Sequence, residues 1–305
     1  MSLISYAQNF EDVMLWRALK HINKGFYIDV GAFSPDNDSI TKFFYEHQNW
    51  NGINIEPNFM QYNEFLCKRP KDINLHVAIS NQEGYLELNI IKDKELLTSN
   101  KNTGLSTLDK DIAQQHIANG YLLEIEKIKV MTLATIYEKY IQPSQEVHFL
   151  KIDVEGLEKE VIQGNKWEHY QPWIVLVEAI SPTNYQETYQ NWEHLLISAG
   201  YCFIYSDLLN RFYISPKHPE LRSAFNYPPN IFDGFLIYNQ TKVFLQKNHI
   251  SNELVTNLEE RIDALLMSTS WKITQPLRTF NILFQLIIHR LKNLFSHIEV
   301  KKLTK

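Results

Sequence analysis

The sequence has few cysteines and no cysteine-rich segment. Its 305 residues include only Cys67 and Cys202. Two cysteines so far apart exclude a disulfide framework, and their spacing is not that of a metal site. We therefore expect both to be buried, reduced thiols.

Long apolar runs are also missing. No run approaches the roughly 20 residues that a membrane-spanning helix needs, and the segment MSLISYAQNFEDVM lacks the charged-then-apolar pattern of a signal peptide. We expect a cytoplasmic protein, with any membrane contact peripheral and at the inner face. With 44% hydrophobic and 13% aromatic residues, the chain can fill one large core.

Charge is distributed unevenly along the chain. Residues 270–305 hold seven Lys or Arg against one acid, a net charge of +6. Because the whole chain carries −5, residues 1–269 carry −11. An acidic body argues against nucleic-acid binding, whereas a basic tail suits an anionic surface. We predict a folded domain over residues 1–240 and a helical, basic, amphipathic extension over 241–305.

Short β-rich runs alternate with helical patterns through the first 215 residues. This alternation predicts an α/β fold, and the last two runs form a hairpin and must be antiparallel. A mostly parallel seven-stranded sheet that closes with such a hairpin is the class I methyltransferase form of the Rossmann-like fold. The predicted sheet strands are 26–30, 53–56, 74–80, 147–154, 173–179, 201–205 and 211–215, and two further β-rich runs, 85–91 and 128–131, flank a polar insertion.

The first strand ends in the segment DVGAFSPDND, which contains a single glycine. A dinucleotide site requires G-x-G-x-x-G, and here only Gly31 remains. One glycine suits a cofactor without phosphates, which needs one close backbone approach and an acid for its cationic end. S-adenosylmethionine fits that description, with Asp29, Gly31 and Ala32 forming the turn and Asp36 and Asn37 available for its amino-acid end.

An acid at the end of the second strand supports the same cofactor. Glu56 lies 25 residues beyond Gly31, near the spacing of an acid that accepts hydrogen bonds from ribose hydroxyls. Pro57 follows it, and Val77, Ala78 and Ile79 at the end of the third predicted strand would lie along the adenine. The plainer alternative is that Asp29 and Glu56 only cap strand ends in solvent.

These residues belong to a longer series of motifs that resembles the FkbM family of S-adenosylmethionine-dependent methyltransferases. The motifs are SYAQNFEDVML, YIDVGA, NIEP, HVAIS, FLKIDVEGLEKEVIQG and PWIVLVEA, in this order between Ser5 and Ala179. The resemblance implies methylation of hydroxyl oxygens on sugars or polyketide-type products. It also implies that Gln8, Glu11 and Asp12 close over the cofactor, although for Glu11 we favour an amphipathic helix. The glycine-poor turn departs from the common pattern, so Ser34 remains an alternative to Asp36 and Asn37.

Three acids lie at or just after the ends of the two predicted strands 147–154 and 173–179. Asp153 and Glu178 end these strands, and Glu155 starts the next helix. Methyl transfer to a hydroxyl needs its proton removed or weakened, so we predict Asp153 and Glu178 as catalytic residues. The three carboxylates suit Mg²⁺, while Asp153 as a direct base and Glu155 as a helix-start acid are the alternatives.

The acceptor site is less defined. Residues 104–107 of the insertion are a candidate lid. Arg211 and Asp233, surrounded by aromatic residues and prolines, suit a carbohydrate acceptor but are equally typical of a sheet edge and its covering loop.

The tail contains two amphipathic segments. Leucines and isoleucines recur at helical spacing over 251–267, which suggests a homodimer. Residues 279–295 combine a broad apolar stripe with basic neighbours, typical of a membrane-surface anchor or of a helix packed on the body.

Two functions are consistent with these patterns. The first is an O-methyltransferase that uses S-adenosylmethionine and acts on a sugar or glycan hydroxyl. The second is a non-catalytic protein of the same fold, tethered by its tail to a membrane-associated glycan-assembly complex. The missing glycines and the closing hairpin argue against a nicotinamide oxidoreductase.

Overall fold

A computed structural model describes most of the chain, namely residues 3–93 and 103–238 together with 260, 261, 264 and 267. Met1–Tyr238 and Asn239–Lys305 are separate compact units, and the first is described by itself. The predicted anchor segment 279–295 lies outside the described residues, as does all but four positions of the predicted dimer segment 251–267.

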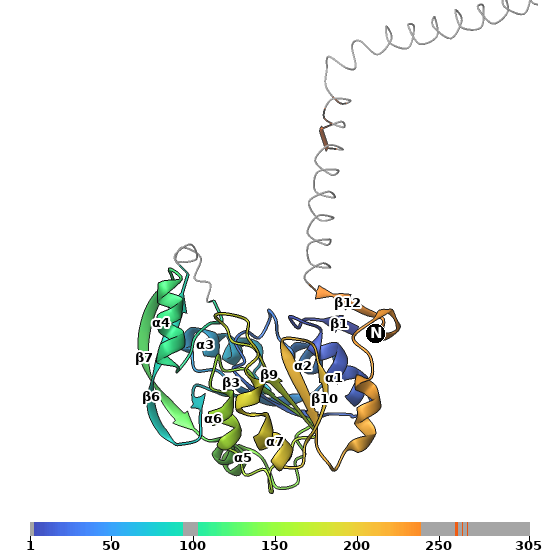
Figure 1. The fold of residues 1–305 in the computed structure, drawn as a ribbon. Coiled ribbons are helices and arrows are strands. Elements are labelled where there is room, and N and C mark those ends of the chain that lie inside the picture. Colours follow the sequence, from blue (N-terminus) through green and yellow to red (C-terminus); the bar gives the residue numbers. More distant parts are fainter. Residues whose placement is uncertain (1–2, 94–102, 239–259, 262–263, 265–266, 268–305) are drawn as a thin grey trace, which may run out of the picture. The chain divides into compact units, whose positions relative to one another are not determined.

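A seven-stranded sheet forms the centre of the first unit, with helices around it (Figure 1). Strand β2 is in the middle of its parallel part. The strand order is β10-β11-β9-β8-β2-β3-β4. Neighbours from β4 to β9 are parallel, whereas β11 runs antiparallel to both β9 and β10, so the sheet is mixed. The predicted α/β class and closing hairpin are confirmed. The strands are β2 (Phe26–Val30), β3 (Asn51–Ile55), β4 (Ile73–Leu75), β8 (Phe149–Ile152), β9 (Ile174–Glu178), β10 (Cys202–Ser206) and β11 (Asn210–Ile214).

Helices cover both faces of the sheet because its strands are apolar on both sides. On one face, α1 (Glu11–Leu19) and α2 (Lys42–His47) pack over strand residues such as Tyr27 and Phe149. On the other, α5 (Leu133–Tyr140), α6 (Glu158–Gln163) and α7 (Glu193–Ser198) cover strand residues such as Ile28 and Leu150. Helix α3 (Phe59–Lys68) lies beside β4 and is capped by Asn58, whose side chain accepts a hydrogen bond from the Met60 backbone.

The prediction of one continuous strand over 74–80 is wrong. Strand β4 ends at Leu75, and β5 (Ala78–Ile79) pairs instead with β7 (Leu122–Met131). The Glu56 backbone N–H makes the last bond of the ladder between β3 and β4, to Leu75 O, and the next N–H that could face β4, that of Asn58, bonds instead to the Glu56 side chain.

The polar insertion folds into a small sheet and a helix. Strand β6 (Gly84–Lys92) pairs antiparallel with β7 over its whole length, and α4 (Lys110–Ala118) packs on both. The helix was not predicted, although it carries a recognisable start signal: the Asp109 side chain accepts hydrogen bonds from the backbone of Asp111 and Ile112.

Short elements complete the unit. Strand β1 (Leu3–Ser5) pairs in parallel with β12 (Phe235–Ile237), and 3₁₀ turns occupy η1 (Tyr189–Asn191), η2 (Pro219–Phe225) and η3 (Ile231–Asp233).

The expectation of buried cysteines is wrong, since Cys67 on α3 and Cys202 on the edge strand β10 are both exposed. Among the described residues, no helix has the length and apolar character to cross a membrane.

Candidate functional site

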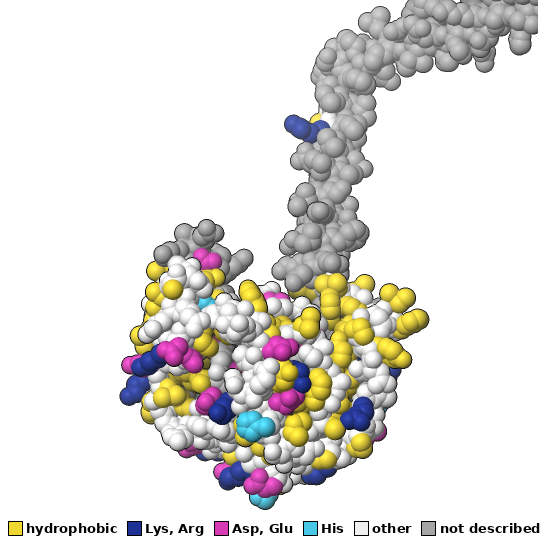
Figure 2. Space-filling view, viewed as in Figure 1, with side chains coloured by type: hydrophobic (Ala, Val, Ile, Leu, Met, Phe, Trp, Pro, Cys, Tyr) yellow, Lys and Arg dark blue, Asp and Glu magenta, His cyan; other side chains and the backbone are white. Residues whose placement is uncertain are grey.

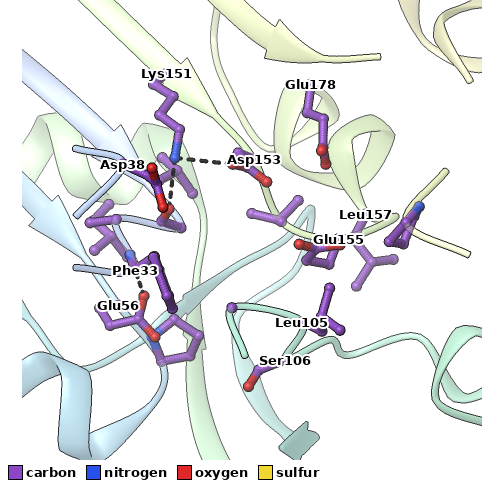
Figure 3. Close-up of a pocket in the computed structure, with 18 of the residues that line it drawn as sticks. Phe33, Asp38, Glu56, Leu105, Ser106, Lys151, Asp153, Glu155, Leu157 and Glu178 are labelled. Carbon is purple, nitrogen blue, oxygen red and sulfur yellow. Dashed lines mark hydrogen bonds and ion pairs between the residues drawn. The ribbon is translucent and has the colours of Figure 1, made fainter. Parts of the chain in front are cut away.

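A cavity of about 330 Å³ opens at the carboxyl ends of the central strands. It lies at the sheet edge where the chain order reverses between β2 and β8, which is where open α/β sheets bind ligands. Its size is at the small end of the range for small-molecule sites. In Figure 3, Glu56 lies on one side of this space and Asp153, Glu155 and Glu178 lie on the other.

The turn after β2 brings backbone close to the cavity. Gly31 has φ +76°, and a Cβ there would lie 1.7 Å from the Asp153 carbonyl oxygen. The backbone N–H groups of Gly31 and Ala32 both bond to Ile55 O. Glycine is therefore required at this point, because neither the conformation nor the space admits a side chain.

Glu56 is buried at the end of β3 and lines the cavity. Its Oε2 accepts a hydrogen bond from Phe33 N at 2.8 Å, and its Oε1 accepts one from Asn58 N at 2.7 Å. Burial raises the pKa of Glu56 to about 7, although the two backbone hydrogen bonds act in the opposite direction. Each oxygen keeps acceptor capacity for a further donor.

Lys151 joins the two central strands electrostatically. It lies opposite Asp29 in the ladder of β2 and β8, with its Nζ 3.4 Å from Asp29 Oδ1 and 3.2 Å from Asp153 Oδ2. The same ammonium donates to Gly31 O at 2.8 Å. Burial acts to lower the pKa of Lys151, but Asp153 and Asp29 outweigh it and raise that pKa. Lys151 is thus a fixed cation in the cavity wall.

Asp29 lies behind that wall. It is 1% exposed and is not among the residues that line the cavity. The sequence predicted Asp29 in the cofactor turn. The structure instead places it beneath the turn, where it pairs with Lys151.

Carboxyl oxygens of Asp153, Glu155 and Glu178 lie within 4.8 Å of one another, so the three predicted acids do meet. Burial, followed by the charge of Asp153, raises the pKa values of Glu155 and Glu178 well above their ordinary range. Oε2 of Glu155 and Oε2 of Glu178 are buried and have no hydrogen-bond partner among the described residues. A cation or a shared proton is needed to offset the repulsion between these groups.

The turn that carries Glu155 is held by the rest of the motif. Glu155 has φ +55°, an unfavourable conformation for a side chain of this kind. The Glu158 side chain accepts hydrogen bonds from the backbone of Val154 and Gly156, and Thr107 Oγ1 of the insertion donates to Glu155 O at 2.8 Å. Glu158 and the insertion therefore fix the direction of Glu155.

The remaining predicted cofactor residues divide into those that line the cavity and those that do not. Ala32, Pro57, Val77, Ala78 and Ile79 line the cavity.

Asp36 and Asn37 do not line it. Asp36 pairs with Lys42 at 2.7 Å and with Lys68 at 2.6 Å, and Asn37 N bonds to Ser34 Oγ. Phe33 and Asp38, both at positive φ, face the cavity instead. The two residues with left-handed backbone turn the intervening segment outward, which the sequence pattern does not reveal.

The predicted acceptor residues Arg211 and Asp233 are also absent from the cavity lining. The Arg211 guanidinium lies 3.8 Å from the ring centres of Tyr189 and Phe203 and pairs with Glu193. The Asp233 carboxylate pairs with Arg17 (Arg17 Nη2 to Asp233 Oδ2, 2.6 Å). Both side chains are occupied by structural contacts.

The insertion and the N-terminal segment contribute to the cavity from outside the parallel strands. Gly104, Leu105 and Ser106 of the candidate lid line it, whereas Thr107 only anchors the neighbouring turn.

Gln8 and Glu11 line it too, while Asp12 is buried and accepts from Ser5 Oγ. Glu11 is both a helix residue and a cavity residue, so the two alternatives for it are compatible.

Asn210 is a cavity residue that sequence reasoning missed. Its Nδ2 donates to Glu11 Oε1 at 2.8 Å, across 199 positions of the sequence. Burial, followed by the charge of Asp207, raises the pKa of Glu11 to about 8. No local pattern marks Asn210, because its role depends on β11 lying next to β9.

Together, the strand-end cavity, the single-glycine turn and the acid after β3 define an α/β protein with a candidate small-molecule site at the carboxyl ends of its strands. Residues 29–203 match the family model described as the methyltransferase FkbM domain. The chain belongs to this family, as the sequence motifs predicted, and the family supports a methyltransferase. No curated protein and no solved structure matches the chain.

Proposed function

We propose that the protein transfers a methyl group from S-adenosylmethionine to a hydroxyl of a sugar or glycan. The observation that carries this proposal is that the Gly31 turn and the buried Glu56 lie next to each other in the lining of one cavity, joined by the hydrogen bond from Phe33 N to Glu56 Oε2. The strand order, with antiparallel β11 between β9 and β10, supports the class I methyltransferase fold.

The donor set fits this cofactor. Glu56 offers carboxylate oxygens to the two ribose hydroxyls, and Val77, Ala78 and Ile79 offer an apolar wall to the adenine. The turn at Gly31, which also lines the cavity, presents backbone and no side chain to the rest of the molecule. The cofactor supplies an electrophilic methyl group, and the residues of this chain bind and orient it.

The opposite end of the cavity suits the acceptor hydroxyl. Asp153, Glu155 and Glu178 are positioned to hold its proton or a divalent cation such as Mg²⁺. We favour the cation, because Glu155 and Glu178 each direct a buried, unpartnered oxygen into the cluster. When bound, such an ion acidifies and orients a hydroxyl. Tyr185, exposed at the rim, offers an aromatic face to a sugar ring.

Cofactor affinity should rise with pH through about 7, the pKa of Glu56 in the free protein. Ribose hydroxyls donate to the ionised carboxylate, so below this pKa each pH unit should cost up to about tenfold in affinity. For folding alone the sign is opposite: the raised pKa favours the folded state at low pH, and this contribution is lost as the pH rises through about 7. Calorimetric titration at several pH values measures the effect.

The Glu56→Gln variant is the control for this prediction. It should bind more weakly and without the step near pH 7. An unchanged step in the variant would assign the dependence to another cavity acid, such as Glu11.

Glu155→Gln and Glu178→Gln should each weaken binding of Mn²⁺ or Mg²⁺ at least about tenfold and lower the rate of methyl transfer, because each removes one charged ligand. S-adenosylhomocysteine affinity should change little, since Glu56 lies on the other side of the cavity. Calorimetry with each ion measures the first effect, with Glu187→Gln, on the exposed surface, as control.

A different result would make Asp153 a direct base. In that case methyl transfer would persist in the presence of a chelator, and of the three acid substitutions only Asp153→Asn would abolish it.

The proposal as a whole is tested by titrating the full chain with S-adenosylmethionine and S-adenosylhomocysteine, alongside NADH. Micromolar binding of the sulfur compounds alone is the expected result, followed by methylation in a screen of sugar and glycan hydroxyls. Binding without turnover would favour the non-catalytic alternative. No binding by folded protein would overturn the proposal.

A further inference from the structure

An apolar tip is exposed on the turn before β12 and on β12 itself. We use this name for Tyr227, Ile231, Phe232 and Leu236, whose exposed fractions are 70%, 87%, 93% and 49%. In the space-filling view, hydrophobic side chains gather over the surface around β1 and β12 (Figure 2). Two large apolar side chains at consecutive positions, Ile231 and Phe232, that are both almost completely exposed are unusual on a protein surface.

The structure holds this tip in place. The Arg17 guanidinium on α1 binds both carboxylate oxygens of Asp233, at 2.8 and 2.6 Å. It also donates to the carbonyl oxygens of Ala224, Tyr227 and Pro228.

Asn230 adds a capping box with Asp233 at the start of η3. These contacts fix the backbone while Ile231 and Phe232 point outward, so their exposure is a built feature of the turn.

The chemistry of the tip suits a low-dielectric surface. Within residues 227–236 the one charged side chain is Asp233, and its pairing with Arg17 leaves that side chain 10% exposed. Neutralising and covering this charge removes the main cost of bringing the turn against hydrocarbon. Phenylalanine, tyrosine and aliphatic residues are the types that enter the interfacial region of a membrane.

Its size argues against a second copy of the chain as the occupant. Four apolar side chains on one turn are far fewer than the roughly 20–30 residues a side of a standard protein interface. A lipid surface requires no shape complementarity, so a small, rigid protrusion suffices.

The sequence that follows supports the same occupant. The chain continues from β12 into residues 239–305, whose last 36 residues carry a net +6 and include the basic, apolar segment 279–295. A basic segment adds attraction to anionic lipid, which an apolar turn alone lacks.

We infer that the apolar tip inserts into the interfacial region of an anionic membrane and acts together with the basic tail. This inference is independent of the proposed methyl transfer.

Flotation of the full chain with phosphatidylcholine vesicles, with and without phosphatidylglycerol, tests it. The parent should float with the anionic vesicles. The double variant Ile231→Ser, Phe232→Ser should bind these vesicles at least about tenfold more weakly, because serine removes the apolar surface that the two original side chains would bury in the membrane. The matched control is Tyr85→Ser, Ile125→Ser, on β6 and β7, where the exposed fractions are 63% and 56%. It should float like the parent.

Three results would overturn the inference. They are a parent that does not bind either vesicle, a double variant that binds as well as the parent, and a parent dimer in solution that the double variant abolishes. The thermal midpoint and the S-adenosylhomocysteine affinity of the double variant should equal those of the parent, because both replaced side chains are exposed and lie away from the cavity lining.

Discussion

Lys151→Met is expected to lower the free energy of unfolding by about 3–5 kcal/mol, because it leaves buried carboxylate charge without its partner. Lys151 is 7% exposed and its ammonium lies against Asp29, Asp153 and the Gly31 carbonyl. Methionine keeps most of the side-chain volume, so the loss reports the charge. Denaturant unfolding followed by fluorescence measures it.

The loss should depend on pH. Burial already raises the pKa of Asp29, and removing the cation raises it further. An acid whose folded-state pKa is raised favours folding at low pH, so the variant should be closest to the parent in acid and fall behind as the pH rises through the new pKa of Asp29.

Two controls bracket this result. Asp29→Asn combined with Lys151→Met should recover much of the lost stability, because no unpaired charge then remains between β2 and β8. Lys129→Met, an exposed lysine on β7, should change stability by less than about 0.5 kcal/mol. A Lys151→Met protein as stable as the Lys129→Met protein would show that the buried pair contributes nothing.

Glu56→Ala is expected to weaken S-adenosylmethionine binding by about 100-fold or more. Two hydroxyls that donate to one carboxylate form charge-assisted hydrogen bonds, each contributing about 1.5–3 kcal/mol. The substitution also leaves the backbone donors of Phe33 and Asn58 without their acceptor, so the turn after β2 loses a support. Calorimetry measures the affinity, and the thermal midpoint separates lost binding from lost folding.

Glu83→Ala, on the exposed turn before β6, is the matched control and should bind like the parent. Glu56→Gln should fall between the two, since it keeps the shape and one acceptor oxygen but not the charge. An alanine variant that folds and binds normally would remove Glu56 from the cofactor site and, with it, the main support for the proposed cofactor.

Much of this architecture follows from local pattern. FYIDV forms β2 over its whole length, and WIVLVEA contains β9, because continuous apolar runs bounded by helical segments are typical of buried parallel strands. Once the strands are parallel, their carboxyl ends share one edge of the sheet. Gly31, Glu56 and Asp153 then fall around one cavity.

Other features depend on details that a pattern does not carry. Asp36 and Asp38 are both acids in the same turn, yet positive φ at Phe33 and Asp38 directs only Asp38 to the cavity. Asp29 has the spacing of a cofactor ligand, but strand alternation places it beneath the turn, opposite Lys151. Local periodicity cannot distinguish these outcomes, because backbone torsion and cross-strand register select between them.

The sequence by itself determined the α/β class, the family, the closing hairpin and the acids at the strand ends, because each depends on residues close together in the chain. Tertiary structure alone decided which of those acids face the cavity, that Asn210 meets Glu11, and that the insertion secures the Glu155 turn through Thr107. These contacts join segments tens to hundreds of residues apart, and only the packing of the whole domain brings them together.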